Sequence, residues 1–141
     1  MAIRQISVYV ENKMGKLHDM VKLVSDNDIN IRASVIADTA DFGILRMIVS
    51  DTDKALRILS ESSMVNIAKV VAVKMADETG SLTKVLSYLK AAGISVEYMY
   101  AFAGDADLGA YVVLRVNDVD NAEKVLAENG IEMLKDEDLA I

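Results

Sequence analysis

Two glycine loops carry the residues of this chain best suited to chemistry. Each loop leads into a predicted helix, whose first N–H groups and dipole favour an anion such as a carboxylate. Glycine has no Cβ, so the backbone can adopt turns closed to other residues and a ligand can come close to it. The loops are Asn12-Lys13-Met14-Gly15-Lys16-Leu17 and Glu78-Thr79-Gly80-Ser81-Leu82. The pattern predicts an anion site at each loop, with the amides near Lys16–Leu17 and Ser81–Leu82 as donors.

Acceptors for a cation lie beside the same donors. Asn12 precedes the first glycine, and Asp77 and Glu78 precede the second. A carboxylate at the helix start and an ammonium group at the polar loop together describe an α-amino acid. The competing interpretation is that Gly15 and Gly80 serve only the turn.

The loops belong to an internal repeat that relates Gly15 to Gly80. The segment Asp28-Ile29-Asn30-Ile31 returns at the same offset as Gly93-Ile94-Ser95-Val96. A repeat of this period predicts two copies of one small unit, with domains at residues 1–69 and 70–141. A unit of about 70 residues has a marginal core when alone, so we expect oligomerisation, most simply a homodimer.

Each copy shows the same order of predicted elements. Alternating apolar residues indicate strands, and apolar residues three and four apart indicate helices. In the first copy the strands are expected near 6–10, 29–37, 44–49 and 65–67, and Asp51 or Thr52 is expected to cap the second helix. In the second copy the strands are expected near 71–75, 96–102, 110–116 and 131–134. There Gly93 is expected to end the first helix, and Asn117 or Asp118 to open the second. The order predicts an α+β fold of two ferredoxin-like βαββαβ units, each an antiparallel sheet with both helices on one face. We expect the two sheets side by side as one eight-stranded sheet.

With this order, the glycine loops resemble those of the ACT domain, a small regulatory module that binds amino acids. The matching segments are Glu11–Leu17 with Ile29-Asn30-Ile31, and Asp77–Leu82 with Ile94-Ser95-Val96. The family often has proline before the glycine, whereas this chain has Met14 and Thr79 there and no proline at all. ACT modules usually accompany a catalytic domain, so the resemblance implies that any regulated metabolic enzyme is encoded separately.

The resemblance also implies that a ligand sits between adjacent copies, against the second strand of the neighbour. That strand carries Arg32 and Ser34 in the first copy, and Glu97, Tyr98, Met99 and Tyr100 in the second. Two alternatives need no ligand. Tyr98, Tyr100 and Phe102 share a predicted strand face with Val96 and fit ordinary core packing. Arg32 and Glu97 occupy matching positions and could form a salt bridge across the seam.

Composition excludes several classes of function. The chain has 141 residues, no cysteine and a formal net charge of −7. Residues 1–69 hold nine basic and nine acidic residues (9 − 9 = 0), and residues 70–141 hold six and thirteen (6 − 13 = −7). Nucleic acid and anionic membranes would be repelled by the second half. No apolar run reaches the roughly 20 residues of a membrane span, and the absence of cysteine and of a secretory signal favours the cytoplasm.

The remaining residues with chemical potential favour structural roles. His18 is the only histidine and is expected on a helix surface, and Asp105 and Asp107 fit a turn better than a calcium site. No metal or cofactor is predicted. An acylphosphatase-like enzyme would need an arginine in the loop, and a metal carrier would need Cys-x-x-Cys. Two functions remain: a non-enzymatic regulatory protein that binds an amino acid, or a ligand-free regulatory subunit of a separate enzyme.

Overall fold

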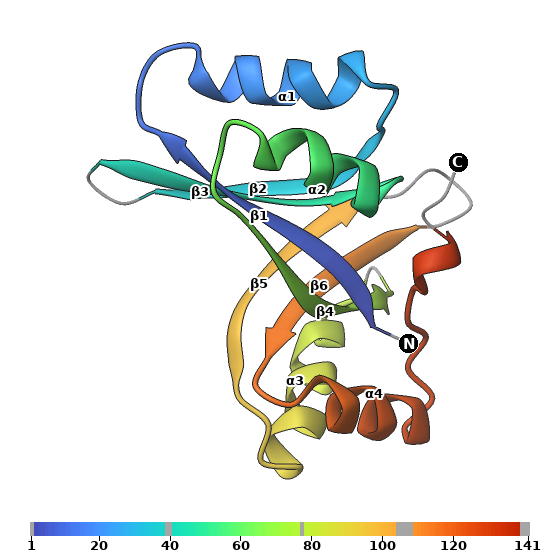
Figure 1. Cartoon of the computed structure of the whole chain (residues 1–141). Helices are drawn as coiled ribbons and strands as arrows, with labels where there is room; N and C mark the ends of the chain where they lie inside the picture. The colour runs from blue at the N-terminus through green and yellow to red at the C-terminus, as the bar shows by residue number, and fades with distance from the viewer. Residues whose placement is uncertain (1, 39–40, 77, 104–108, 139–141) are drawn as a thin grey trace. The chain divides into compact units, whose positions relative to one another are not determined.

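A computed structural model describes residues 2–38, 41–76, 78–103 and 109–138 of the chain. The elements follow in the order β1 (Ile3–Glu11), α1 (Lys16–Asp26), β2 (Ile31–Asp38), β3 (Phe42–Val49), α2 (Thr52–Ser60), β4 (Val65–Met75), α3 (Ser81–Ala91), β5 (Val96–Ala103), β6 (Ala110–Val116), α4 (Val119–Glu128) and a short 3-10 helix at Asp136–Asp138 (Figure 1). The chain divides into two compact units, a first unit of Arg4–Ala68 and a second unit of Lys69–Asp138, to which Ala2 and Ile3 also belong. The antiparallel sheets and repeated βαββαβ order confirm the predicted α+β class.

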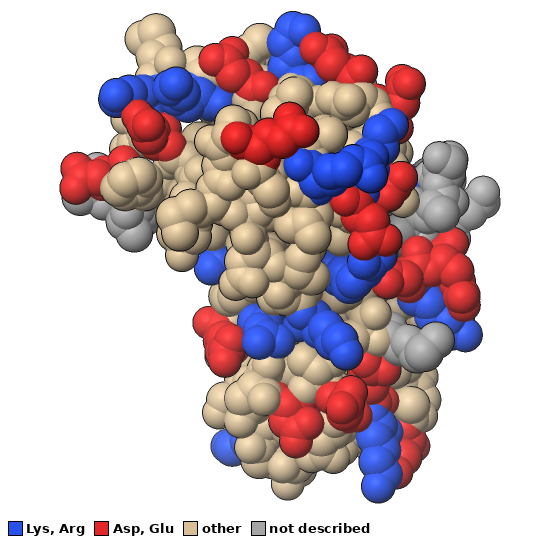
Figure 2. Space-filling model, viewed as in Figure 1, with Lys and Arg blue, Asp and Glu red and all other residues tan. Residues whose placement is uncertain are grey.

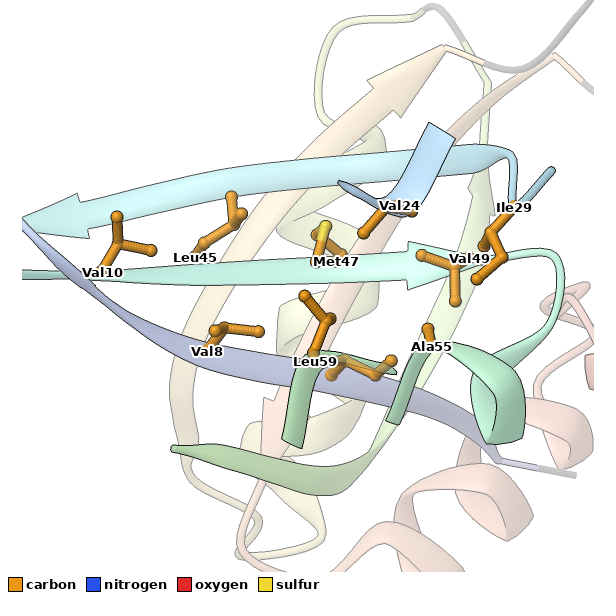
Figure 3. Packing of buried hydrophobic residues seen from close by; sticks show 10 residues of the cluster. Val8, Val10, Val24, Ile29, Leu45, Met47, Val49, Ala55 and Leu59 are labelled. Carbon is orange, nitrogen blue, oxygen red and sulfur yellow. The ribbon is translucent and has the colours of Figure 1, made fainter. Parts of the chain in front are cut away.

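In the first unit the strands lie in the order β2-β3-β1-β4. Helices α1 and α2 cover one face of this sheet (Figure 1). The core between them is made by the alternating apolar residues of β1 and β3, Val8, Val10, Leu45, Met47 and Val49, together with Val24 and Ile29 from the α1 side and Ala55 and Leu59 from α2 (Figure 3). The predicted apolar stripes therefore face one core, as the periodicities of 2 and 3.6 require.

The second unit repeats this arrangement with one difference. Its strands lie in the order β4-β6-β5, and α3 and α4 supply Val85, Leu89, Ala122 and Leu126 to its core. Residues 131–134, predicted as a closing strand, form only the single bridge between Met133 and Val73. The strands predicted at 65–67 and 71–75 are one continuous strand, β4. The described residues therefore contain six named strands in place of the eight expected.

A β-bulge interrupts the second strand of each unit at the same repeat position. The register shifts between Ile31 and Ala33 in β2 and between Val96 and Tyr98 in β5, so Arg32 and Glu97 are the extra residues. An extra residue moves every later side chain to the opposite face of the sheet. The two bulges are therefore part of the repeated design and place Arg32 and Glu97 where the pairing is broken.

The bulge in β5 makes wrong the prediction that Tyr98, Tyr100 and Phe102 share a strand face with Val96. Tyr100 is paired with Val113 and Phe102 with Tyr111, whereas the neighbouring Leu114 of β6 belongs to the core beneath the helices. The aromatic side chains of β5 therefore lie on the face away from the helices and do not share the face of Val96. Tyr100 is buried there, and the ring of Phe102 stacks on Tyr111 with centroids 5.6 Å apart.

Helix ends follow local sequence signals. The carboxylates of Asp51 and Asp118 each accept the amide of the residue three positions on, at 3.1 Å, so each is the N-cap of its helix. Gly93 follows α3 with φ +73°, as predicted for a helix-ending glycine. Within the described residues, no helix is both long enough and apolar enough to cross a bilayer.

Candidate functional site

The two glycine loops form the same turn. In the first, the amide of Lys13 donates to the Glu11 carbonyl at 2.8 Å and the amide of Lys16 to the Lys13 carbonyl at 3.2 Å. At the equivalent positions of the second, the amide of Glu78 donates to the Ala76 carbonyl at 2.9 Å and that of Ser81 to the Glu78 carbonyl at 3.2 Å. The sequence repeat is therefore a repeat of backbone hydrogen bonding.

The glycines are required by backbone conformation. Gly15 has φ +82° and Gly80 has φ +88°, in the left-handed region that costs other L-residues free energy. A Cβ built on either glycine would meet no atom within 4 Å. Each glycine is the N-cap of its helix, where the next amides have no carbonyl inside the helix to bond to. Each turn thus has open space beside its glycine, while the first amide after the glycine, that of Lys16 or Ser81, is bonded within the turn.

A pocket lies beside each turn, within its own unit. In the first unit it has a volume of about 530 Å³ and is lined by Tyr9, Val10, Glu11, Lys16, Asp19, Met20, Leu23, Phe42, Ser62, Ser63 and Met64. In the second unit the volume is about 490 Å³ and the lining is Lys74, Met75, Ala76, Glu78, Ser81, Lys84, Val85, Gly130, Ile131 and Glu132. Both volumes fall within the range of small-molecule sites. The end of the first strand, the start of the first helix and the segment after the second helix meet in each.

The structure brings only some of the predicted site residues to these pockets. Lys16 lines the first pocket, and Glu78 and Ser81 line the second. Asn12 lines a smaller hollow of about 310 Å³ with Glu11, Lys13, Asp41 and Phe42. The other loop positions lie on the turns: Met14, Gly15, Thr79 and Gly80 are exposed, Leu17 is 40% exposed and Leu82 is half-buried against the core of the second unit. Asp77, Asp105 and Asp107 lie outside the described residues.

The residues predicted from the neighbouring strand lie at the bulges of β2 and β5. Arg32 and Tyr98 are half-buried, and Glu97 is exposed. The carboxylate of Glu97 lies 3.5 Å from Nε of Arg115 on β6, and Nη1 of Arg115 donates to the Lys69 carbonyl at 2.8 Å. Glu97 therefore has an ion-pair partner within its own unit.

Charges of both signs surround the turns. The Lys13 ammonium lies 3.0 Å from Glu11, and this hydrogen bond, with the charges of Lys13 and Lys16, lowers the pKa of the Glu11 carboxyl. His18 lies on the surface beside Asp19, with Nδ1 3.3 Å from the carboxylate. Acidic and basic side chains are interspersed in the same way on the face drawn in Figure 2. In the described part of the chain, no three His, Cys, Asp or Glu residues group as a metal site would require.

Several residues that line the pockets were not predicted from the sequence. Phe42 follows a turn, and Ser62, Ser63 and Met64 follow α2, so all are distant from Gly15 in sequence. Glu132 occupies the corresponding segment after α4. The repeat could have indicated these residues, because the segment after the second helix occurs at the same place in each copy.

Comparison with known proteins identifies the family. The family model for an ACT domain pair matches residues 1–141. The chain belongs to the ACT domain family. This confirms the resemblance seen in the glycine loops, and it makes each βαββαβ unit an ACT fold. ACT domains are regulatory and bind small-molecule ligands.

Solved structures agree with the ACT assignment. Protein BT0572 from Bacteroides thetaiotaomicron is 41% identical, with a TM-score of 0.91 over 99% of this chain and 96% of that one. The regulatory subunit of aspartate kinase from Thermus thermophilus, in its ligand-free form, is 13% identical, with a TM-score of 0.62 over 89% and 91%. A structure of aspartokinase alpha and beta subunits is 18% identical, with a TM-score of 0.59 over 89% and 90%. The two aspartate kinase structures share the fold of this chain. A search of curated proteins found no match.

Proposed function

We propose that this ACT domain pair, with its two domains at 1–69 and 70–141, is a non-enzymatic regulatory protein that binds an amino acid at a glycine turn. The observation that carries the proposal is the duplicated turn, in which Gly15 and Gly80 take the same left-handed conformation at a helix start. The amides that follow at the start of each helix, from Leu17 and Leu82 onward, suit a carboxylate. Glu11 and Glu78, at the two turns, suit an ammonium group.

The regulated target is proposed to be a separately encoded metabolic enzyme. Among structures of the same fold are one named as a regulatory subunit of aspartate kinase and one that contains aspartokinase alpha and beta subunits. Those names support a subunit that acts on an enzyme carried by another chain. We further propose that the protein is a homodimer, because units of about 70 residues gain stability from added contacts. We propose the cytoplasm as its location.

A thermal-shift screen against the twenty amino acids, followed by calorimetry on each hit, tests the proposal. A ligand that binds the folded state raises the melting temperature at concentrations well above its dissociation constant. Gly15→Ala or Gly80→Ala, whichever changes the turn of the unit that holds the ligand, should weaken the binding, because alanine strains that turn. The outcome that contradicts the proposal is a flat screen, or an affinity that Gly15→Ala and Gly80→Ala leave unchanged.

Gly93→Ala is the matched control. Gly93 has φ +73° and open space around its Cβ position, so alanine there carries a similar backbone strain. It lies after the end of α3, away from the turn that opens this helix. Gly15→Ala, Gly80→Ala and Gly93→Ala should lower the melting temperature by similar amounts, and only a turn variant should lower ligand affinity.

A second function has specific support. Met14, at the tip of the first turn, is fully exposed and can therefore contact another chain. A ligand-free subunit would use this tip to contact its enzyme. Met14→Gln would then abolish co-purification with the enzyme, whereas the amino-acid proposal predicts that this variant keeps its ligand response.

A further inference from the structure

The two ACT units carry pockets at the same position that differ in chemistry at three matched residues. The correspondence rests on hydrogen bonds. The amide of Tyr9 donates to the Met64 carbonyl at 3.2 Å in the first unit, and the amide of Lys74 donates to the Glu132 carbonyl at 2.8 Å in the second. Tyr9 therefore matches Lys74, and Met64 matches Glu132. The side chains at matched positions can be compared directly.

A third matched position follows from the strand register. Val10 pairs with Gly43, and Met75, the counterpart of Val10 in the repeat, pairs with Ala110. The residues before these partners, Phe42 and Gly109, are therefore equivalent. The pocket of the first unit thus has three large apolar side chains where the second has lysine, glycine and glutamate.

The apolar side chains of the first pocket are held open to solvent. Tyr9 is 47% exposed, Phe42 is 49% exposed and Met64 is 73% exposed. In the second unit the Nζ of Lys74 lies 3.3 Å from the carboxylate of Glu132, so the same position is a solvated ion pair. The backbone accepts either chemistry, and the fold therefore does not require exposed apolar groups in the first unit. Large apolar side chains gathered at an open pocket are typical of a binding site.

The polar residues of the first pocket define the other end of its occupant. Glu11 and Asp19 are acidic, Lys16 is basic, and Ser62 and Ser63 add hydroxyl groups. Lys16 is the first residue of α1, where the helix dipole also favours an anion. A zwitterion can therefore place its carboxylate toward Lys16 and its ammonium toward the two acidic groups. The volume of about 530 Å³ accommodates one small molecule.

We propose that the first unit alone binds an amino acid with a large apolar side chain, in the pocket formed by Tyr9, Phe42 and Met64. This inference rests on the proposed amino-acid function and adds the ligand class and the unit that takes it. The side chain packs against the three apolar residues, and the charged groups at the start of α1 hold the zwitterion. The ion pair of Lys74 and Glu132 closes the equivalent position of the second unit to an apolar side chain, because burying a charge costs more than an apolar contact returns.

Titration calorimetry with L-phenylalanine, L-methionine and L-serine tests the assignment. We expect one site per chain, with phenylalanine or methionine bound more tightly than serine. The double variant Tyr9→Lys with Met64→Glu copies the residues of the second unit, so the fold already carries them at that position. It should weaken binding of the apolar amino acids by about tenfold or more while the melting temperature stays within about 2 °C. The double variant Lys74→Gln with Glu132→Gln is the control and should leave the affinity unchanged.

Three results would overturn the assignment: two equal sites per chain, equal affinity in the Tyr9 and Met64 double variant, or no binding of phenylalanine and methionine. Binding of serine alone, lost in Gly80→Ala, would preserve the proposed function and reject the apolar pocket. Phenethylamine, which lacks the carboxylate, tests the apolar pocket separately from the amino-acid function. If it binds as tightly as phenylalanine and loses affinity in the double variant, the pocket stands and the amino-acid function fails.

Discussion

Replacement of Asp28 by glycine should stabilise the first unit. Asp28 follows α1 with φ +58° and is the one described non-glycine residue with positive φ. Its counterpart in the repeat is Gly93, with φ +73°. The helix ends in the same way in both units, because the amide of the next residue donates to a carbonyl of the helix. The amide of Ile29 donates to the Val24 carbonyl at 3.3 Å, and the amide of Ile94 donates to the Leu89 carbonyl at 2.9 Å. Glycine at position 28 therefore keeps every backbone hydrogen bond.

The size of the effect follows from three opposing terms. The left-handed conformation costs an L-residue roughly 1–2 kcal/mol, with aspartate at the lower end, and glycine removes that cost. The greater freedom of glycine in the unfolded chain takes back about 0.4–1 kcal/mol. Removing a carboxylate from the negative end of the α1 dipole adds about 0.3–1 kcal/mol at low salt. The sum is a gain of about 1 kcal/mol in the free energy of unfolding, or about 4 °C in melting temperature.

Urea unfolding and thermal unfolding at low and high salt measure the gain. Asp28→Asn separates the terms, because asparagine removes the charge and tolerates the left-handed region without the freedom of glycine. Gly93→Asp is the reciprocal change and should lower stability by a similar amount. The reasoning is refuted if Asp28→Gly is no more stable than the natural chain while Gly93→Asp is tolerated without loss.

Three further perturbations test the packing, the caps and the electrostatics of the structure. Leu59→Ala, in the core of the first unit, should cost about 2–5 kcal/mol in urea unfolding, and retention of full stability would contradict the described core. Asp51→Ala and Asp118→Ala each remove an N-cap and should each cost about 1 kcal/mol, with equal losses if the caps are equivalent. Lys13→Met should raise the pKa of Glu11, measured by NMR titration. Because the folded pKa of Glu11 is lowered, the pair stabilises the fold above the unfolded pKa and loses this effect as pH falls through the folded pKa. An unmoved Glu11 titration in that variant would reject the pairing.

Most of the local structure could be predicted from sequence, because its causes lie within a few residues. The apolar stripe of α2 and its cap at Asp51 are local signals, and both are confirmed. The left-handed turns follow from glycine at a strand-to-helix junction, and the repeat showed that Gly15 and Gly80 are equivalent. The family also followed from these local signals in their order, since the element order and the glycine loops together mark the ACT fold.

The bulges, the continuous β4 and the pockets were decided by tertiary structure. Alternation in 96–102 predicts a strand, but the face on which Tyr98, Tyr100 and Phe102 lie depends on how β5 pairs with β6. One extra residue at Glu97 reverses that face. Likewise, nothing local joins Tyr9 to Met64, which come from β1 and the segment after α2. A backbone hydrogen bond links them although most of the first unit separates them along the chain.

The sequence by itself therefore determined the repeated unit, its helices and the conformation of its glycine turns, because short-range sterics and periodicity govern them. Tertiary structure alone decided which side chains share a sheet face and which line each pocket. The physical reason is that strand register and loop placement arise from the pairing of distant segments, to which each residue contributes only a small part of the free energy.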